Sequence, residues 1–279
     1  MLCLLASGWL LSSCPKLAAA QQMRRERTPR EIVLPPKIVA GEPATLAVID
    51  EGSRLLPGVT VGLTGGQEVT TDSTGRALFI APSAAGAFFA KIPHTRISAS
   101  SICVAGEEGA AATSSTGGPG ALKLSSYPHV LAVRDRFAIS GSGFLGAADS
   151  NRVVLGGGQC LVIAASPVSL VILPGPRVPI GTISLHLTVR GGDEKSFPVT
   201  SVLLDFSGPA EAPAAGADGK LILHVHGTTE PLAVEVHNAS PQIIQLLHGN
   251  LQRLGTSGGE ENIAPVELKY LAAGDYVIS

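Results

Sequence analysis

The stretch Gly181-Thr182-Ile183-Ser184-Leu185-His186-Leu187-Thr188-Val189 alternates apolar and polar residues. Successive side chains of a β-strand point to opposite faces, so its isoleucine, leucines and valine would all lie on one face. The serine, histidine and threonines would lie on the other face. The stretch therefore predicts a strand with one buried face, and the same alternation recurs around residues 46–48 and 59–63.

The composition supports a protein built of many short strands. The chain has 279 residues, of which 33 are glycine and 20 are proline, and these imply many turns. Charged residues make up 15% and the formal net charge is −2, which argues against general disorder and against an electrostatic nucleic-acid footprint. We therefore expect an all-β protein of two or three domains, with no nucleic-acid partner.

The first residues resemble a leader for export. The apolar stretch of residues 2–11 is too short to cross a bilayer as a helix and is typical of a secretory signal. The following Leu11-Ser12-Ser13-Cys14 resembles a bacterial lipobox, in which cleavage leaves a cysteine to be acylated. Ala18-Ala19-Ala20 before Gln21 offers a competing site of ordinary secretion. Of the two, we favour lipidation at Cys14.

Shifts in composition divide the rest of the chain into three units. Residues 105–121 and 207–217 are rich in Gly, Ala, Ser, Thr or Pro, which is typical of linkers. We predict a leader over residues 1–20, an immunoglobulin-like β domain over 38–104, a β-sandwich over 122–206 and a C-terminal β-rich domain over 218–279.

The middle unit resembles the IPT/TIG family. The resemblance begins with Phe-Ala-Ile-Ser-Gly-Ser-Gly-Phe at 137–144 and Asn-Arg-Val-Val-Leu-Gly-Gly at 151–157, followed by Cys160. Ser-Pro-Val-Ser-Leu-Val-Ile-Leu-Pro at 166–174 is similar to the family's middle strand, and residues 181–189 to its closing strand. The resemblance implies an immunoglobulin-like sandwich of the kind found in cell-surface proteins, exported proteins and some DNA-binding factors. The charge balance argues against the last class.

Glycines in the first two units mark turns and bends. Val-Thr-Thr-Asp-Ser-Thr-Gly-Arg-Ala-Leu-Phe at 69–79 predicts a hairpin, and it resembles bacterial immunoglobulin-like and carboxypeptidase-regulatory-like repeats. The glycines at 156–158 predict a hairpin tip. Gly141 and Gly143 predict a bulge or tight bend.

Cys103 and Cys160 are the cysteines that remain after the leader. They would form a disulfide in an oxidising compartment if they lay close together. We favour the alternative of two buried thiols in separate domains.

The C-terminal unit holds the sharpest candidate for chemistry. We expect strands around residues 221–225 and 232–236 to form a hairpin, with His224, His226, Glu235 and His237 on one face. Three imidazoles from adjacent strands can bind zinc and leave a position for water. Outward polar residues on a strand explain the same pattern more simply. Residues 243–254 fit either a helix or two strands joined by a turn at 249–250, and we favour the strands.

Other catalytic patterns are weak in this sequence. It has no Gly-x-Ser-x-Gly elbow, and Asp72, Asp149 and the Glu260-Glu261 pair fall in expected turns, where calcium binding is the alternative to turn formation. Aromatic residues make up 4%, which supplies few stacking platforms for carbohydrate.

These observations favour an exported, non-catalytic bacterial protein of the periplasm or cell surface, built of tandem immunoglobulin-like β-sandwiches. It would act as a structural, adhesive or docking module for a protein or surface polymer, and a lipid on Cys14 would provide its contact with a membrane. We expect no cofactor. The alternatives are a metal-binding protein or zinc enzyme using His224, His226 and His237, and a carbohydrate-binding module.

Overall fold

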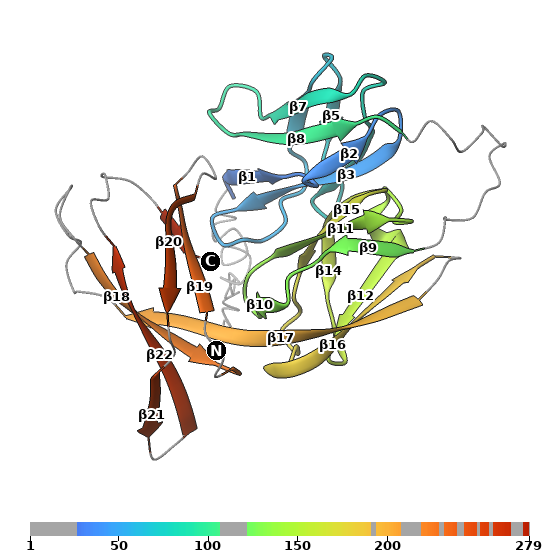
Figure 1. The fold of residues 1–279 in the computed structure, drawn as a ribbon. Coiled ribbons are helices and arrows are strands. Elements are labelled where there is room, and N and C mark those ends of the chain that lie inside the picture. The colour runs from blue at the N-terminus through green and yellow to red at the C-terminus, as the bar shows by residue number, and fades with distance from the viewer. Residues whose placement is uncertain are drawn as a thin grey trace, which may run out of the picture.

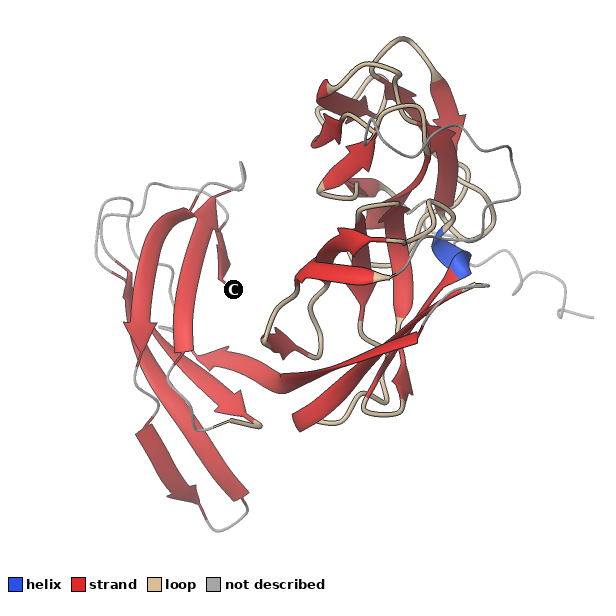
Figure 2. Ribbon diagram, turned by 45° about the vertical axis from the view of Figure 1, so that its right-hand side comes forward, coloured by secondary structure: helices blue, strands red, loops and turns tan. Residues whose placement is uncertain are grey.

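The computed structural model describes residues 27–106, 122–190, 194–207, 219–228, 232–238, 243–249, 252–256, 259–268 and 276–278. From residue 219 onward, side chains are described for 222–228, 262 and 263. The described residues form strands and one short 3-10 helix, Ala148–Ser150 (Figures 1 and 2). The predicted all-β fold is confirmed. No helix among these residues is both long and apolar enough to cross a membrane.

The first unit is a β-sandwich. One sheet has the order β2-β8-β7-β4-β5, and the opposite layer contains β1, β3 and β6. Their inner faces enclose an apolar core in which the rings of Phe79 and Phe88 stack with centroids 5.3 Å apart. The strands are β1 Pro29–Val33, β2 Lys37–Val39, β3 Pro43–Asp50, β4 Thr60–Leu63, β5 Glu68–Thr70, β6 Arg76–Ile80, β7 Gly86–Lys91 and β8 Ser98–Val104.

The second unit is also a sandwich with its own core. Strands β14-β15-β11-β9 form one layer, and β13-β12-β16-β17 form the other, with β10 parallel to β17. The strands are β9 Lys123–Ser126, β10 Val130–Ala132, β11 Phe137–Ser142, β12 Asn151–Leu155, β13 Gly158–Gln159, β14 Leu161–Ser166, β15 Ser169–Leu173, β16 Gly181–Val189 and β17 Glu194–Ser207.

The alternating stretch at 181–189 forms β16, as predicted. Leu185, Leu187 and Val189 are buried in the core of the second unit, whereas Thr182 and Ser184 are exposed. The strand lies between β12 and β17 and pairs antiparallel with both. The period of the pattern therefore predicted both the element and its buried face.

The glycine-rich turns of the second unit are also where the sequence predicts them. Gly156 and Gly157 have φ of +52° and +87° and connect β12 to β13, so the predicted hairpin tip is confirmed. A side chain is strained in this left-handed region, whereas glycine adopts it readily. At Gly141 the register of β11 shifts against β9, which confirms the predicted bulge.

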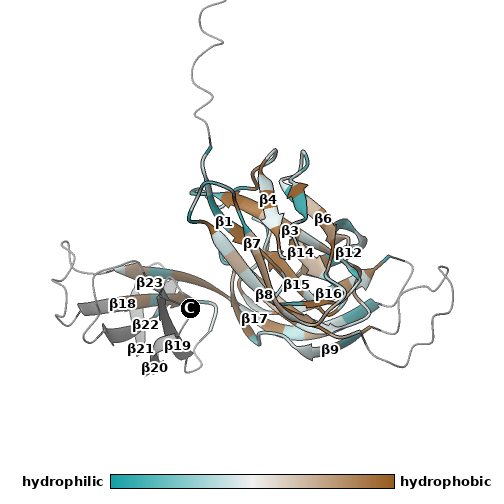
Figure 3. Cartoon of the chain, turned by 90° about the horizontal axis from the view of Figure 1, so that it is seen from above, coloured by the Kyte–Doolittle hydropathy of each residue, from teal (hydrophilic) through white to brown (hydrophobic). Residues whose placement is uncertain are grey.

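Strand β3 differs from the prediction, because both of its faces are buried. Leu46 and Val48 face the core of the first unit, whereas Ala47 and Ile49 on the other face pack against the second unit. Ala165 of β14 pairs with Thr45 of β3, so one sheet runs from the first unit into the second. Figure 3 shows the apolar strands β3, β14 and β15 side by side.

Strand β17 links the second unit to the third. Its residues 194–201 pair with β16, and its residues 203–207 pair with β18 (Figure 1). The predicted spacer over 207–217 therefore begins at the end of β17, and the strands on either side of it pair with each other. Residues 208–217 lie outside the described part. The third unit contains β18 Gly219–His226, β19 Leu232–Asn238, β20 Ile243–Gly249, β21 Gln252–Thr256, β22 Gly259–Leu268 and β23 Tyr276–Ile278.

The predicted hairpin between residues 221–225 and 232–236 is wrong. Strand β18 pairs with β17 and β22, whereas β19 pairs with β20 and β23 in a separate sheet of three strands. Two strands do form over residues 243–256, as we favoured. They do not pair with each other. Strand β20 pairs with β19, whereas β21 pairs with β22.

The predicted hairpin at residues 69–79 is a sheet crossing instead. Strand β5 pairs with β4 in one layer of the first sandwich, and β6 pairs with β3 in the other. The turn itself is present, since Gly75 has φ +76° and its amide donates to the Asp72 carbonyl oxygen at 2.9 Å. Local sequence placed the turn correctly, but packing of the two layers selected the strand partners.

Candidate binding site at the junction of the first two units

A buried apolar layer joins the first two units. Strands β1 and β3 of the first unit meet β14 and β15 of the second, and the facing side chains are buried. Burial of such aliphatic groups stabilises the contact by roughly 25 cal/mol for each Å² removed from water. The buried members are Val33, Ala47, Ile49, Ile163, Ala164 and Val171.

Polar groups inside this junction are paired across it. The Thr45 hydroxyl donates to the Gly146 carbonyl oxygen at 2.6 Å and accepts the Ala148 amide at 3.2 Å. The hydroxyls of Ser166 and Ser169 donate to the Lys37 carbonyl oxygen at 2.6 and 2.7 Å. These hydrogen bonds fix the register of the two units, because any displacement would leave buried groups without partners.

Arg76 is a cation buried at the same junction. Its Nη1 donates to the Val162 carbonyl oxygen at 3.0 Å, and its Nε donates to the Thr74 hydroxyl at 3.0 Å. Its Nη2 pairs with Asp149 Oδ1 at 2.7 Å. A buried guanidinium is tolerated only when its donors are satisfied, and here the second unit supplies two of its partners.

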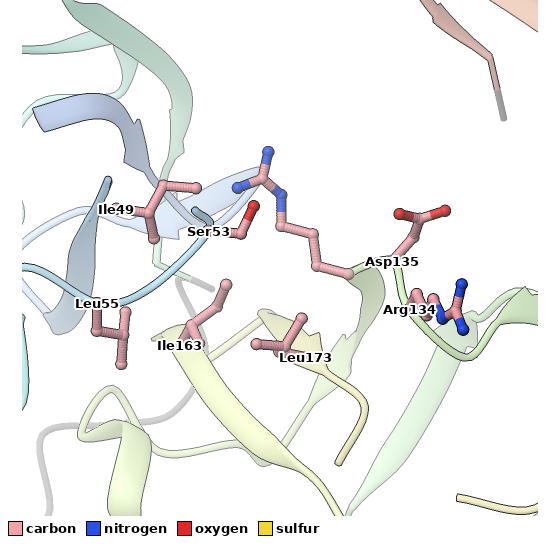
Figure 4. Close-up of a pocket in the computed structure, with 8 residues that line it drawn as sticks. Ile49, Ser53, Leu55, Arg134, Asp135, Ile163 and Leu173 are labelled. Carbon is pink, nitrogen blue, oxygen red and sulfur yellow. The ribbon is translucent and has the colours of Figure 1, made fainter. Parts of the chain in front are cut away.

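A pocket opens beside the junction and is lined by both units (Figure 4). Four aliphatic side chains converge on it, two from the first unit and two from β14 and β15 of the second. Ser53 and the charged turn between β10 and β11 contribute polar groups. The lining residues are Ile49, Ser53, Leu55, Arg134, Asp135, Arg136, Ile163 and Leu173.

The two arginines of this turn are engaged in ion pairs. Arg136 Nη2 lies 2.6 Å from Glu31 Oε1, and Arg134 Nη1 lies 3.2 Å from Asp205 Oδ1. The first pair crosses from the second unit to β1, and the second reaches β17. The pocket is thus small, about 130 Å³, with an apolar floor and a polar rim.

Asp50 holds the loop that carries Ser53. Its Oδ1 accepts the amides of Gly52 and Arg54 at 2.9 and 3.0 Å, and its Oδ2 lies 3.2 Å from Arg54 Nη2. The Arg54 amide, together with the Arg54 charge and the Gly52 amide, holds the pKa of Asp50 below its ordinary value despite burial. The carboxylate form thus fixes one wall of the pocket.

The histidines predicted as zinc ligands are divided between two sheets. His224 and His226 lie on β18, opposite Asp205 and Leu203 of β17, whereas His237 lies on β19. Nε2 of His224 lies 2.9 Å from the Ser207 hydroxyl. The described side chains contain no group of three or more His, Cys, Asp or Glu suited to a metal. The side chains of Glu235 and His237 lie outside the described part, so the zinc site stays a prediction without the hairpin that suggested it.

The acidic loop residues that the structure describes stabilise the fold. Asp72 Oδ1 accepts the Thr74 amide and hydroxyl at 2.7 and 2.6 Å, which shapes the turn before β6. Asp149 pairs with Arg76, as described above. The turn expected at Glu260 and Glu261 is wrong, because both residues lie in β22 and pair with β21. Their side chains lie outside the described part.

The predicted pair of buried thiols is confirmed. Neither Cys103 nor Cys160 is disulfide-bonded, and each is buried in the core of a different unit. Burial raises the pKa of both thiols. Cys14 lies outside the described residues, so its lipidation stays a prediction.

Comparison with known proteins identifies the second unit. A family model described as the IPT/TIG domain matches residues 125–203. Residues 125–203 are an IPT/TIG domain. The match confirms the family resemblance noted in the sequence and supports a structural or binding module. It does not extend to residues 38–104, whose resemblance to bacterial immunoglobulin-like repeats stays a prediction. No curated protein sequence matches the chain.

Several solved structures resemble the whole chain at low identity. One is SGBP-B of a Bacteroides ovatus mixed-linkage glucan utilization locus, solved with a mixed-linkage heptasaccharide. It is 12% identical with a TM-score of 0.30, over 92% of this chain and 76% of that one. Domains 1–6 of the surface layer protein SbsC are 12% identical with a TM-score of 0.24, over 90% and 38%. The insect immune protein hemolin is 14% identical with a TM-score of 0.25, over 88% and 69%.

The junction and its pocket were not predicted from the sequence. The available signal was the nearly continuous apolar run at 44–49, since a strand buried on both faces loses its alternation. Thr45 lies within that run and contacts Gly146, which is 101 residues away, and nothing in the sequence indicates this contact.

Proposed function

We propose that this protein is an exported, non-catalytic bacterial docking module of the periplasm or cell surface, tethered by a lipid on Cys14. In this proposal the first two units act as one rigid body that presents the junction pocket to a protein or surface polymer. The observation that carries the proposal is the buried junction between the units, which an IPT/TIG domain forms with its neighbour in the chain.

A rigid pair of sandwiches is useful for docking because it lowers the entropy cost of binding. Loops and pockets that already have their bound arrangement lose little freedom when a partner arrives. The pocket is composite, with Leu55 from one unit and Leu173 from the other, so it exists only while the units are packed together. Recognition would therefore depend on the junction as well as on the lining residues.

The rigidity can be measured as a distance between spin labels. We would place cysteines at the exposed positions Ser100 and Thr182, one in each unit, after replacing Cys3 and Cys14 by serine. The native Cys103 and Cys160 are buried and would resist labelling. A narrow distance distribution, as narrow as that of a control pair at Ser125 and Thr182 within the second unit, supports one rigid body. A broad distribution between the units, with a narrow control, rejects it.

Export and tethering can be tested by the intact mass of the protein recovered from a bacterial host. We expect a chain beginning at an acylated Cys14 in the membrane fraction, and release from that fraction by Cys14→Ser. A soluble chain beginning at Gln21 would keep export and reject the lipid anchor. An unprocessed chain beginning at Met1 in the cytosol would reject both.

A further inference from the structure

Strand β6 lies at a free edge of its sheet. It pairs with β3, and no other described strand pairs with it. The Ala81 amide donates to the Glu42 carbonyl oxygen, and the Val48 amide donates to the Gly75 carbonyl oxygen. Because alternate residues of an antiparallel strand face the same neighbour, the backbone groups of Leu78 and Ile80 must point away from β3. Neither makes a hydrogen bond to another described residue.

The side chains at this edge are apolar and exposed. Leu78 is 57% and Ile80 is 52% exposed, although both belong to a strand whose other face is buried. They lie on the face of β3 and β6 that forms the junction, because Leu78 is opposite the junction residue Thr45. The apolar face thus continues from the junction, beyond the part that the second unit covers.

Apart from its short length of 5 residues, β6 lacks the common protections against edge pairing. Edge strands are commonly guarded by an exposed charge, a proline or a bulge. The one charged residue of β6 is Arg76, whose side chain is turned into the junction and is 8% exposed. At that end of the strand, the Arg76 carbonyl oxygen already accepts the Asp72 amide at 2.8 Å. The part of the β6 edge that is available for pairing is therefore Leu78-Phe79-Ile80.

We propose that this edge pairs with the same edge of a second copy of the chain, antiparallel about a two-fold axis at Phe79. Leu78 of each copy would then lie opposite Ile80 of the other, and each such pair would exchange both backbone hydrogen bonds. The exposed leucine and isoleucine side chains of the two copies would cover one another. The sheet that joins the first two units would continue through the dimer.

The second copy fits this edge because the edge is complementary to itself. An isologous contact needs each group to meet its counterpart after a two-fold rotation, and an apolar residue at both 78 and 80 meets that need. The paired residues, Leu78-Phe79-Ile80, carry no charge that would repel the same residues of the second copy. Dimerisation of the purified chain would not depend on the export or the lipid anchor proposed above.

The contact between the two β6 edges is short, so the dimer should be weak. Small interfaces are typical of transient complexes, and we expect a dissociation constant of about 0.1–1 mM. The test uses the full chain with Cys14→Ser, so that acyl chains cannot associate, in sedimentation equilibrium up to ~1 mM. Amide hydrogen exchange on the same samples should show Leu78 and Ile80 becoming protected as the concentration rises.

A matched pair of variants distinguishes edge pairing from nonspecific association of exposed apolar residues. Leu78→Lys places a charge on the edge and should raise the dissociation constant at least about tenfold. Ile102→Lys is the control, because Ile102 is also 57% exposed but lies on β8, between β2 and β7. This control should leave the dissociation constant within about twofold of the parent chain. Thermal melts of both variants would establish that each one folds.

Three results would overturn the proposal. They are a monomer at ~1 mM, equal weakening by the two variants, and protection of other amides without protection of Leu78 and Ile80. Pairing of β6 with a strand of a different protein in place of a second copy would appear as the first result.

Discussion

Arg76 and Asp149 form an ion pair that joins β6 of the first unit to the 3-10 helix of the second, with Nη2 and Oδ1 2.7 Å apart. The two partners are unequal, since the arginine side chain is 8% exposed and the aspartate side chain is 78% exposed. The energetic importance of the contact should therefore lie with the buried partner, which also donates to Thr74 and Val162.

The first prediction compares the two ends of this ion pair. Arg76→Ala should lower the free energy of unfolding by about 2–4 kcal/mol, because it leaves the buried Val162 carbonyl oxygen without its donor and opens a cavity. Asp149→Asn should cost about 0.5–1 kcal/mol, because water already screens the carboxylate. Urea denaturation of both variants measures the difference. Equal costs would show that the ion pair, and not the buried hydrogen bonds, dominates the contact.

The second prediction concerns the closest backbone approach at the junction. A Cβ on Gly146 would overlap the Pro43 carbonyl group, so Gly146→Ala should cost about 1–3 kcal/mol through overpacking and force the units apart. Calorimetry should then resolve two transitions for these units, whereas we expect them to unfold in a single transition in the parent chain. Gly62→Ala is the control, since its Cβ would find its nearest neighbour, the Lys91 carbonyl oxygen, at 3.7 Å. An unchanged single transition in Gly146→Ala would contradict the tight junction.

The third prediction is a loss of stability in acid that depends on Asp72. Hydrogen bonds from the Thr74 hydroxyl and from the Thr74 and Arg76 amides lower the pKa of Asp72. The unfolded chain, with an ordinary aspartate pKa of 3.8, therefore binds this proton more readily than the folded chain. The contribution of Asp72 is present above that value and is lost as the pH falls through the lower folded value.

Urea midpoints measured from pH 6 down to pH 3 should therefore fall less steeply in Asp72→Asn than in the parent chain. Asp50, whose pKa is also lowered, should account for part of the slope that remains in the variant. Parallel curves for the parent chain and the variant would rule out a contribution from Asp72.

The fourth prediction is that both core thiols are inert in the folded protein. Cys103 and Cys160 are buried, and burial raises the pKa of each, so little reactive thiolate is present at neutral pH. Alkylation should proceed only through unfolding, and its rate should rise with added urea. After unfolding without reductant, mass spectrometry should find both cysteines modified. A mass two hydrogens lower, with neither cysteine modified, would reveal a disulfide instead.

Much of the local structure could be predicted from the sequence because local rules decide it. The alternation at 181–189 encodes which face of β16 is buried, whatever strand lies beside it. Gly156 and Gly157 encode a turn with positive φ, which few other residues adopt without strain. The IPT/TIG landmarks combine several such signals in one order, and the family match confirmed them.

The candidate site could not be predicted in the same way. The lining of the pocket comes from chain segments far apart in the sequence, such as Leu55 and Leu173. The zinc prediction depended on β18 pairing with β19. The alternation of apolar and polar residues in a strand does not indicate which other strand pairs with it. The sites that were predicted on local grounds, such as the turn at Asp72, proved to be structural.

The sequence by itself thus determined an all-β chain, its turns, its IPT/TIG unit and the buried faces of single strands, because period and backbone preference act over a few residues. Only the tertiary structure decided that β3 is buried on both faces, that Arg76 reaches the second unit, and that β17 belongs to two units at once. Those outcomes depend on which apolar faces remain uncovered once each sheet has formed. That choice is made by the burial of whole surfaces and is not encoded at any one position.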